Sequence, residues 1–199
     1  ELRTPLTALK LQVQLAERAK TPEAQQKAFS RLHAGIDRAT GLVQQLLTVA
    51  RLDPDAHSKP FVNVDVEHIL RSVSEELMVL AHQKDIQIEV DAKATTVSGI
   101  EDVLKLLLIN LCDNAIRYTQ AKGRIVLSAK EENNQVIIAV SDNGPGIAPE
   151  ERERIFDRFY RVDKARTRQK GGFGLGLSLA KQIVDALKGT ISVKDNKPH

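Results

Sequence analysis

The chain has 199 residues, of which 42% are hydrophobic, so it is long and apolar enough for one or two modest domains. Its formal net charge of +3 is too small to indicate a nucleic-acid-binding protein. No apolar run approaches the ~18–20 residues that a membrane-spanning helix requires. The one cysteine, Cys112, excludes an internal disulfide and is expected to be a small buried hydrophobe.

Two amphipathic segments open the chain and predict a helical hairpin over residues 1–53. Between them, Thr21 is a candidate N-cap and Pro22 suits a first helical position, so the short link predicts antiparallel helices. Two helices cannot enclose a core, so the hairpin is expected to pair with a second copy in a four-helix bundle. Apolar residues recur at spacings of three and four, as in a coiled coil, at Leu2, Leu6, Leu9, Val13 and Ala16 and again at Leu32, Ile36, Ala39, Val43, Leu46 and Ala50.

Helical and strand patterns alternate after the hairpin and predict an α/β sandwich over residues 61–199. Pro54 and Pro60 mark residues 54–60 as a linker, and Asp65 is a candidate N-cap for the helix that follows. Periodicity predicts helices over residues 65–83, 99–118 and 175–187, and alternation predicts strands over 61–64, 86–90, 125–129, 136–140 and 190–193.

The segment over residues 142–172 is long, charged and poor in periodic apolar positions. Such a segment without a clear element indicates a functional loop or lid. Phe156, Phe159 and Tyr160 are expected chiefly to pin this lid on the core. Arg161 is its candidate for a phosphate contact.

Two asparagines, Asn110 and Asn114, are four residues apart in a predicted helix, so their amides lie on one face. Neutral oxygen ligands suit a Mg²⁺ ion that anionic phosphates already bridge. The alternative is a pair of capping or surface asparagines. One turn further on, Arg117 could reach phosphate and Tyr118 could lie against adenine.

The first glycine-rich block directly follows a predicted strand. Asp142 at its start could accept a hydrogen bond from the exocyclic amino group of adenine. Gly144 and Gly146 would let the backbone approach the base closely.

The second glycine-rich block precedes the last predicted helix. Backbone amides at Gly172, Gly174 and Gly176, together with the helix N-terminus, would make an anion site for phosphates. The block is neither a Walker loop nor a Rossmann fingerprint, because no Gly-Lys-Ser/Thr follows it and no strand immediately precedes it.

Four blocks occur in an order that resembles the asparagine, first glycine, phenylalanine and second glycine boxes of the histidine-kinase ATP-binding domain. The first six residues resemble the phosphoacceptor box of the same family without its histidine. From residue 1 to about 194 the chain therefore resembles the cytoplasmic part of bacterial membrane sensor histidine kinases of the two-component type. The blocks are Asn110–Asn114, Asp142–Gly146, Phe156–Phe159 and Gly172–Leu177, and the opening is Glu1-Leu-Arg-Thr-Pro5-Leu6.

This resemblance implies a dimerisation and phosphotransfer hairpin, followed by a Bergerat-type (GHKL-type) α/β sandwich with a mixed sheet. It implies that ATP with Mg²⁺ phosphorylates a histidine, and that an aspartate of a response-regulator receiver domain then receives the phosphoryl group. Many members also dephosphorylate the regulator. A homodimer is implied, with no nucleic-acid partner. The membrane would be reached only through segments upstream of this chain, which would be the cytoplasmic portion of a bacterial inner-membrane protein.

The resemblance also assigns roles to individual residues. Glu1 would assist proton removal from the neighbouring acceptor, and Thr4 would orient water in the phosphatase step. Ile147 and Leu177 would join the residues named above in the nucleotide site.

The sequence departs from the family pattern at both ends. No histidine precedes Glu1, and the family's final strand does not follow residues 191–193, so residues 1–199 are expected to bind ATP without their own acceptor. Two other classes remain open. A hydrolysing ATPase of the gyrase type would carry a glutamate where Asn110 stands, and an amide cannot act as a base. A catalytically dead scaffold would not need the intact asparagine, aspartate and glycine blocks.

Overall fold

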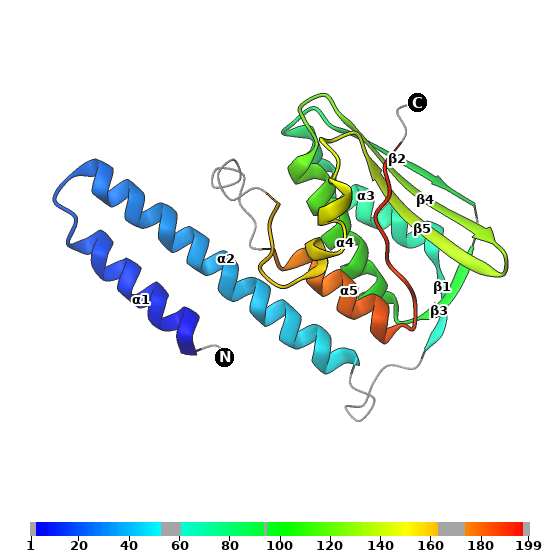
Figure 1. The fold of residues 1–199 in the computed structure, drawn as a ribbon, viewed down its shortest axis with the longest axis horizontal. Coiled ribbons are helices and arrows are strands. Elements are labelled where there is room, and N and C mark those ends of the chain that lie inside the picture. The colour runs from blue at the N-terminus through cyan, green and yellow to red at the C-terminus, as the bar shows by residue number, and fades with distance from the viewer. Residues whose placement is uncertain (1–2, 53–60, 94, 163–173, 197–199) are drawn as a thin grey trace.

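The computed structural model describes residues 3–52, 61–93, 95–162 and 174–196. An N-terminal helical hairpin precedes an α/β unit (Figure 1). The expected fold class, a hairpin followed by an α/β sandwich with a mixed sheet, is confirmed. The expected linker at residues 54–60 lies outside the described residues. Within the part of the chain that the structure describes, no helix combines the length and apolarity needed to cross a membrane.

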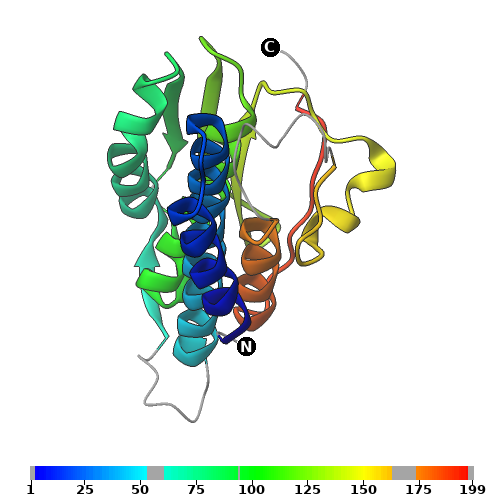
Figure 2. The same cartoon turned by 90° about the vertical axis from the view of Figure 1, so that its left-hand side faces the viewer.

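The hairpin consists of α1 (Arg3–Glu17) and α2 (Pro22–Leu52), which lie side by side (Figures 1 and 2). The turn forms as predicted, because the backbone N–H of Ala24 donates to the Thr21 hydroxyl at 3.2 Å and Pro22 opens α2. Several large apolar side chains remain 40–54% exposed on this single hairpin. They are Leu11, Val13, Leu15, Phe29, Ile36 and Val43.

The larger sheet has three strands in the order β2-β4-β5, namely β2 (Gln87–Ala92), β4 (Arg124–Glu132) and β5 (Gln135–Asp142). It is mixed, because β2 runs parallel to β4 and β4 runs antiparallel to β5. The β4–β5 turn has positive φ angles of 52° at Asn133 and 60° at Asn134. Asparagine tolerates this conformation better than most residues, which explains the predicted turn.

A smaller sheet pairs β1 (Val62–Asp65) antiparallel with β3 (Thr96–Gly99). Strand β3 was not predicted, although the β-branched pair Thr96-Val97 favours a strand there. The strand predicted at residues 190–193 is wrong, since these residues belong to no strand. The C-terminal segment is instead fastened through the side chains of Asp195 and Asn196.

Three helices complete the α/β unit: α3 (Val66–His82), α4 (Glu101–Tyr118) and α5 (Gly176–Ala186). The carboxylate of Asp65 caps α3 by accepting from the backbone N–H of His68 at 3.1 Å, as predicted. Helices α3 and α4 pack against each other and on the larger sheet, and α5 packs on α4.

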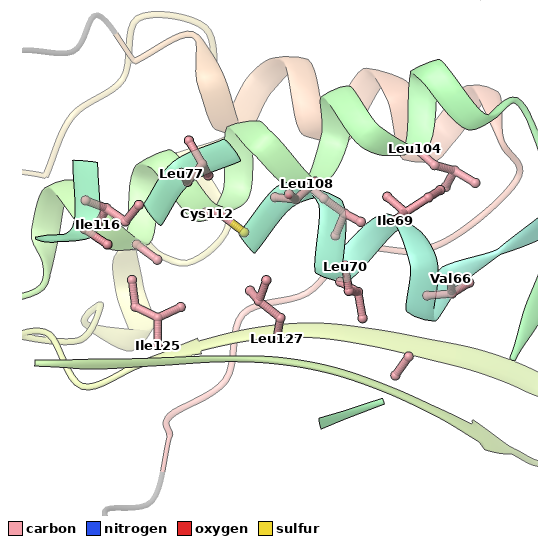
Figure 3. Packing of buried hydrophobic residues seen from close by; sticks show 14 of the residues in the cluster. Val66, Ile69, Leu70, Leu77, Leu104, Leu108, Cys112, Ile116, Ile125 and Leu127 are labelled. Carbon is pink, nitrogen blue, oxygen red and sulfur yellow. The ribbon is translucent and has the colours of Figure 1, made fainter. Parts of the chain in front are cut away.

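The main core lies between the sheet and helices α3 and α4 (Figure 3). Leu70 of α3, Leu108 of α4 and Ile125 and Leu127 of β4 are at most 2% exposed. Burying each such side chain stabilises the fold by about 1.5–3 kcal/mol. Cys112 is buried in the same cluster, as expected.

The predicted lid contains two short 3-10 helices, η1 (Pro149–Glu151) and η2 (Arg154–Phe156). Ile155 is only 6% exposed and anchors this segment, whereas Phe159 is 57% exposed. The expectation that Phe159 pins the lid on the core is therefore wrong, and the aliphatic neighbour of Phe156 takes that place.

Candidate functional site

Helix α4 carries two different kinds of residue along one face. Positions 103, 107, 110 and 114 follow the three- and four-residue spacing that aligns side chains on a helix. Val103 and Leu107 pack on Leu179 and Ile183 of α5 in a second hydrophobic cluster. Further along, the same face turns polar at positions 110 and 114, at the level where α5 begins.

The amide of Asn110 has a defined orientation. Its Nδ2 donates to the carbonyl of Leu106 at 2.7 Å, so Oδ1 is the atom directed away from the helix backbone. A Cβ built on Gly176 would lie 3.6 Å from that oxygen. An amide oxygen of α4 therefore faces the first residue of α5.

The N-terminus of α5 has no side-chain cap. Leu175 occupies the cap position without a side-chain hydrogen bond, and the Ser178 hydroxyl donates to the Leu175 carbonyl at 2.9 Å. The first amides of a helix have no partner within it and attract anions. Gly176 and Leu177 contribute such amides beside Asn110.

The loop after β5 begins with an internal hydrogen bond. One carboxylate oxygen of Asp142 accepts from the backbone N–H of Gly144 at 2.8 Å. A Cβ built on Gly144 would lie 2.7 Å from that oxygen and 3.4 Å from the carbonyl oxygen of Tyr118. The loop thus lies against the C-terminal end of α4, and a side chain at position 144 would displace the Asp142 carboxylate. Gly146 has a φ of +72°, which glycine adopts readily, and Ile147 is half-buried.

The C-terminal end of α4 is tied down by charged side chains. Arg117 forms an ion pair of 2.8 Å with Asp113, one turn earlier in the same helix. Lys84 donates through Nζ to the carbonyls of Ile116 at 2.7 Å and Arg117 at 3.0 Å. No role was predicted for Lys84, because the two carbonyls that it binds lie more than thirty positions further along the chain. The Asp113 carboxylate thus holds the Arg117 guanidinium on the surface of α4.

The lid contains a small polar cluster around Tyr160. Its hydroxyl donates to Glu151, and the guanidinium of Arg154 lies 4.4 Å from the ring centroid. The hydrogen bond to Glu151, together with desolvation, raises the pKa of Tyr160 above its ordinary value. These contacts fix the segment that leads to Arg161, which is half-buried.

The predicted site residues fall into three groups. Asn110 lies beside Gly176 where α4 meets α5, and Asn114 follows one turn later. Asp142 and Gly144 lie beside Tyr118 at the C-terminal end of α4, with Gly146 and Ile147 further along the same loop. Glu1 and Gly172 lie outside the described residues, as does the side chain of Thr4 in α1. Gly174 lies against the backbone of Tyr160.

The donor set fits a nucleotide with its magnesium ion. Among the described residues, no group of three or more His, Cys, Asp or Glu side chains could hold a metal alone. The oriented Oδ1 of Asn110 offers a neutral oxygen next to an uncapped helix N-terminus. That combination suits a cation that arrives already coordinated by phosphate oxygens.

Two family models match the chain. The model described as histidine kinase-, DNA gyrase B-, and HSP90-like ATPase matches residues 99–199. The model described as the His Kinase A (phospho-acceptor) domain matches residues 1–55.

Individual proteins are similar over nearly the whole chain. The sensor protein CiaH of Streptococcus pneumoniae serotype 4 is 43% identical over 208 residues, covering 100% of this chain and 45% of that protein. The structure of the Acinetobacter baumannii histidine kinase AdeS matches with a TM-score of 0.70 and 28% identity, covering 96% of this chain and 88% of that one. Full-length ShkA in complex with AMPPNP matches with a TM-score of 0.68 and 32% identity, covering 98% and 41%. The chain spans less than half the length of the curated relative that it matches.

Proposed function

The chain belongs to the histidine kinase-, DNA gyrase B- and HSP90-like ATPases, and within them to the bacterial two-component sensor histidine kinases. We propose that it binds ATP with Mg²⁺ for phosphoryl transfer to a histidine. One observation carries this proposal. The oriented amide oxygen of Asn110, in the middle of α4, faces Gly176 at the start of α5, while the Asp142 loop lies at the C-terminal end of α4.

Each part of this arrangement has a chemical task. Asn110 and Asn114 would hold Mg²⁺, and the first amides of α5 would hold the phosphates. The bound ion would neutralise charge that develops on the transferred phosphoryl group. At the C-terminal end of α4, Asp142 would accept from the adenine amino group, and Tyr118 and Ile147 would lie near the base. The remaining proposed nucleotide-binding residues are Gly172, Gly174, Leu177, Arg117 and Arg161.

Phosphoryl transfer is favoured over hydrolysis by the residue type at position 110. An amide cannot take a proton from water, and Nδ2 of Asn110 is already bound to the Leu106 carbonyl. The site would therefore retain ATP until a better-placed nucleophile arrives. We infer that this nucleophile is a histidine next to Glu1, with Thr4 acting in dephosphorylation and a response-regulator aspartate as the final acceptor.

A homodimer and a cytoplasmic location at the inner membrane complete the proposal. The apolar side chains exposed on the hairpin, including Val13 and Ile36, support pairing with a second copy in a four-helix bundle. The location rests on the family alone. Fractionation of cells that express the full-length protein would test it.

Calorimetric titration with AMPPNP, in the presence and absence of Mg²⁺, tests the nucleotide site. The wild-type chain should bind more tightly with Mg²⁺, and Asn110→Ala should remove that difference while keeping a normal circular-dichroism spectrum. Steady release of inorganic phosphate from ATP, at rates typical of hydrolysing enzymes, would favour the ATPase alternative instead.

A further inference from the structure

Two residues of the C-terminal segment support the loop over residues 142–147 at its two ends, Asn196 directly and Asp195 through Arg152. Asn196 donates through Nδ2 to the backbone carbonyl of Asp142 at 3.0 Å. Asp195 forms an ion pair of 2.5 Å with Arg152. Arg152 in turn donates through Nε to the carbonyl of Ile147 at 3.1 Å. The loop is thereby joined to a segment that lies more than forty residues further along the chain.

Arg152 is suited to this bridging position. Its Nε and Nη2 lie on one edge of the planar guanidinium, so a single side chain reaches both the Ile147 carbonyl and the Asp195 carboxylate. A lysine has one nitrogen on a flexible stem and would hold this pair of acceptors less well. The Arg152 side chain is 25% exposed and that of Asp195 is 74% exposed, so the ion pair alone adds little stability to the fold.

Pro145 has a fixed φ, but the two glycines of the loop are flexible points, so contacts from outside help to set its geometry. Gly144 and Gly146 lie within it, and a Cβ built on Gly146 would meet nothing within 4 Å. Glycine backbone is conformationally free, so the loop geometry depends on the hydrogen bonds at its ends. Those bonds come from within the loop at Gly144, from Arg124 of β4 at Asn143, and from Arg152 and Asn196.

We propose that Arg152, Asp195 and Asn196 are positioning residues for adenine recognition: they clasp the two ends of the loop over residues 142–147 so that the Asp142 carboxylate meets the base. This inference rests on the proposed function, because it assigns a task to residues around the same site. None of the three needs to touch the nucleotide. Their effect is on where Asp142 lies.

The test compares two nucleotides that differ at the base. ATP has the exocyclic amino group that Asp142 would bind, and inosine triphosphate carries an oxygen there with the same ribose and phosphates. Asn196→Ala and Asp195→Ala should each weaken ATP binding about two- to tenfold, the size of one lost hydrogen bond. Inosine triphosphate binding should change little, so the preference for ATP should fall. Arg152→Ala should have the largest effect, and Arg152→Lys an intermediate one.

Glu67→Ala is the matched control. It breaks an ion pair of 2.7 Å with Arg71 on α3, away from the loop, and should leave the nucleotide preference unchanged. A general loss of structure would weaken both nucleotides together, which would overturn the positioning role. An unchanged preference in all three alanine variants would also overturn it while leaving the proposed function intact. A wild-type chain that binds neither nucleotide would overturn both.

Discussion

The backbone N–H of Phe159 donates to the carbonyl of Gly174 across 2.9 Å, so two positions fifteen residues apart in the chain are joined. Both residues have positive φ angles, 64° at Phe159 and 69° at Gly174. A Cβ built on Gly174 would lie 2.4 Å from the carbonyl oxygen of Tyr160. The phenylalanine and second glycine blocks are therefore held together by backbone contacts that exclude any side chain.

Gly174→Ala should consequently disturb the lid more than the backbone strain of a positive φ angle would by itself. The left-handed conformation costs alanine about 1–2 kcal/mol, and the overlap with Tyr160 adds to it. We expect ATP affinity to fall about tenfold or more, with little change in melting temperature because the contact lies outside both hydrophobic clusters. Gly146→Ala, which has a positive φ but open space around it, should have a smaller effect in the same calorimetric titration. Equal losses in the two variants would contradict the role of the close approach.

Asp142→Asn should weaken ATP binding by about 1–3 kcal/mol, because a charge-assisted hydrogen bond to the adenine amino group is lost. The amide oxygen can still accept from Gly144, so the loop should keep its internal bond. Calorimetric titration measures the change. Asp185→Asn, which alters an ion pair with Lys181 near the C-terminal end of α5, serves as control. Full ATP affinity in Asp142→Asn would rule out the adenine assignment.

Ile36→Asp should convert the proposed homodimer into a monomer. Ile36 is 46% exposed on the single hairpin, and a charge buried there in a four-helix bundle would have no partner. Sedimentation velocity at high micromolar concentration should give a dimer for the wild-type chain. The control variant Lys27→Asp replaces a side chain of the same helix that is already charged, and it should remain a dimer. A monomeric wild-type chain would contradict the bundle itself.

The Cys112 thiol should react slowly and make stability depend on alkaline pH. Burial, aided by the charge of Asp113, raises its pKa from 9.0 to about 12. The folded state therefore holds this proton more tightly than the unfolded state, and stability falls as pH rises from about 9 towards 12. Between pH 8 and pH 10, the urea midpoint of unfolding should fall further for the wild-type chain than for Cys112→Ala. Iodoacetamide should modify the thiol in native protein only at the rate of unfolding.

A polypeptide of residues 1–199 should bind ATP yet acquire no phosphoryl group. Its five histidines, unlike a histidine next to Glu1, lie outside the phosphoacceptor pattern. In-line transfer needs a nucleophile within about 3–3.5 Å of the γ-phosphate. A short N-terminal extension ending in histidine should restore acid-labile phosphate from γ-labelled ATP. Stable label at His33, or on any other side chain of the unextended chain, would show that the acceptor was misassigned.

Elements with strong local signals could be predicted from the sequence. The caps at Thr21 and Asp65 and the Asn133–Asn134 turn each depend on residues within four positions, and all form as expected. The strand at 96–99 was missed because its four residues gain their hydrogen bonds only from β1, more than thirty positions earlier. The burial of Ile155 in place of Phe159 likewise depends on how the lid meets the core.

The candidate site divides in the same way. The asparagine spacing on α4 places Asn110 and Asn114 by helical geometry alone. The orientation of the Asn110 amide, the Asp113 partner of Arg117 and the bridge through Arg152 depend on which acceptors the folded chain brings near. Contacts between residues 43 and 54 positions apart, as at Asp195 and Asn196, have no local sequence signal.

Helix α4 lies between the two hydrophobic clusters, with Leu104 and Leu108 in one and Val103 and Leu107 in the other. Neither cluster can open without loss of this helix, so its amide protons should be among the slowest to exchange with deuterated solvent. The loop over residues 142–147 lacks that protection. Bound nucleotide should therefore slow amide exchange in the loop and leave exchange in α4, which supplies Asn110 and Asn114, nearly unchanged. The site would then combine a rigid helix with a loop that becomes ordered on binding.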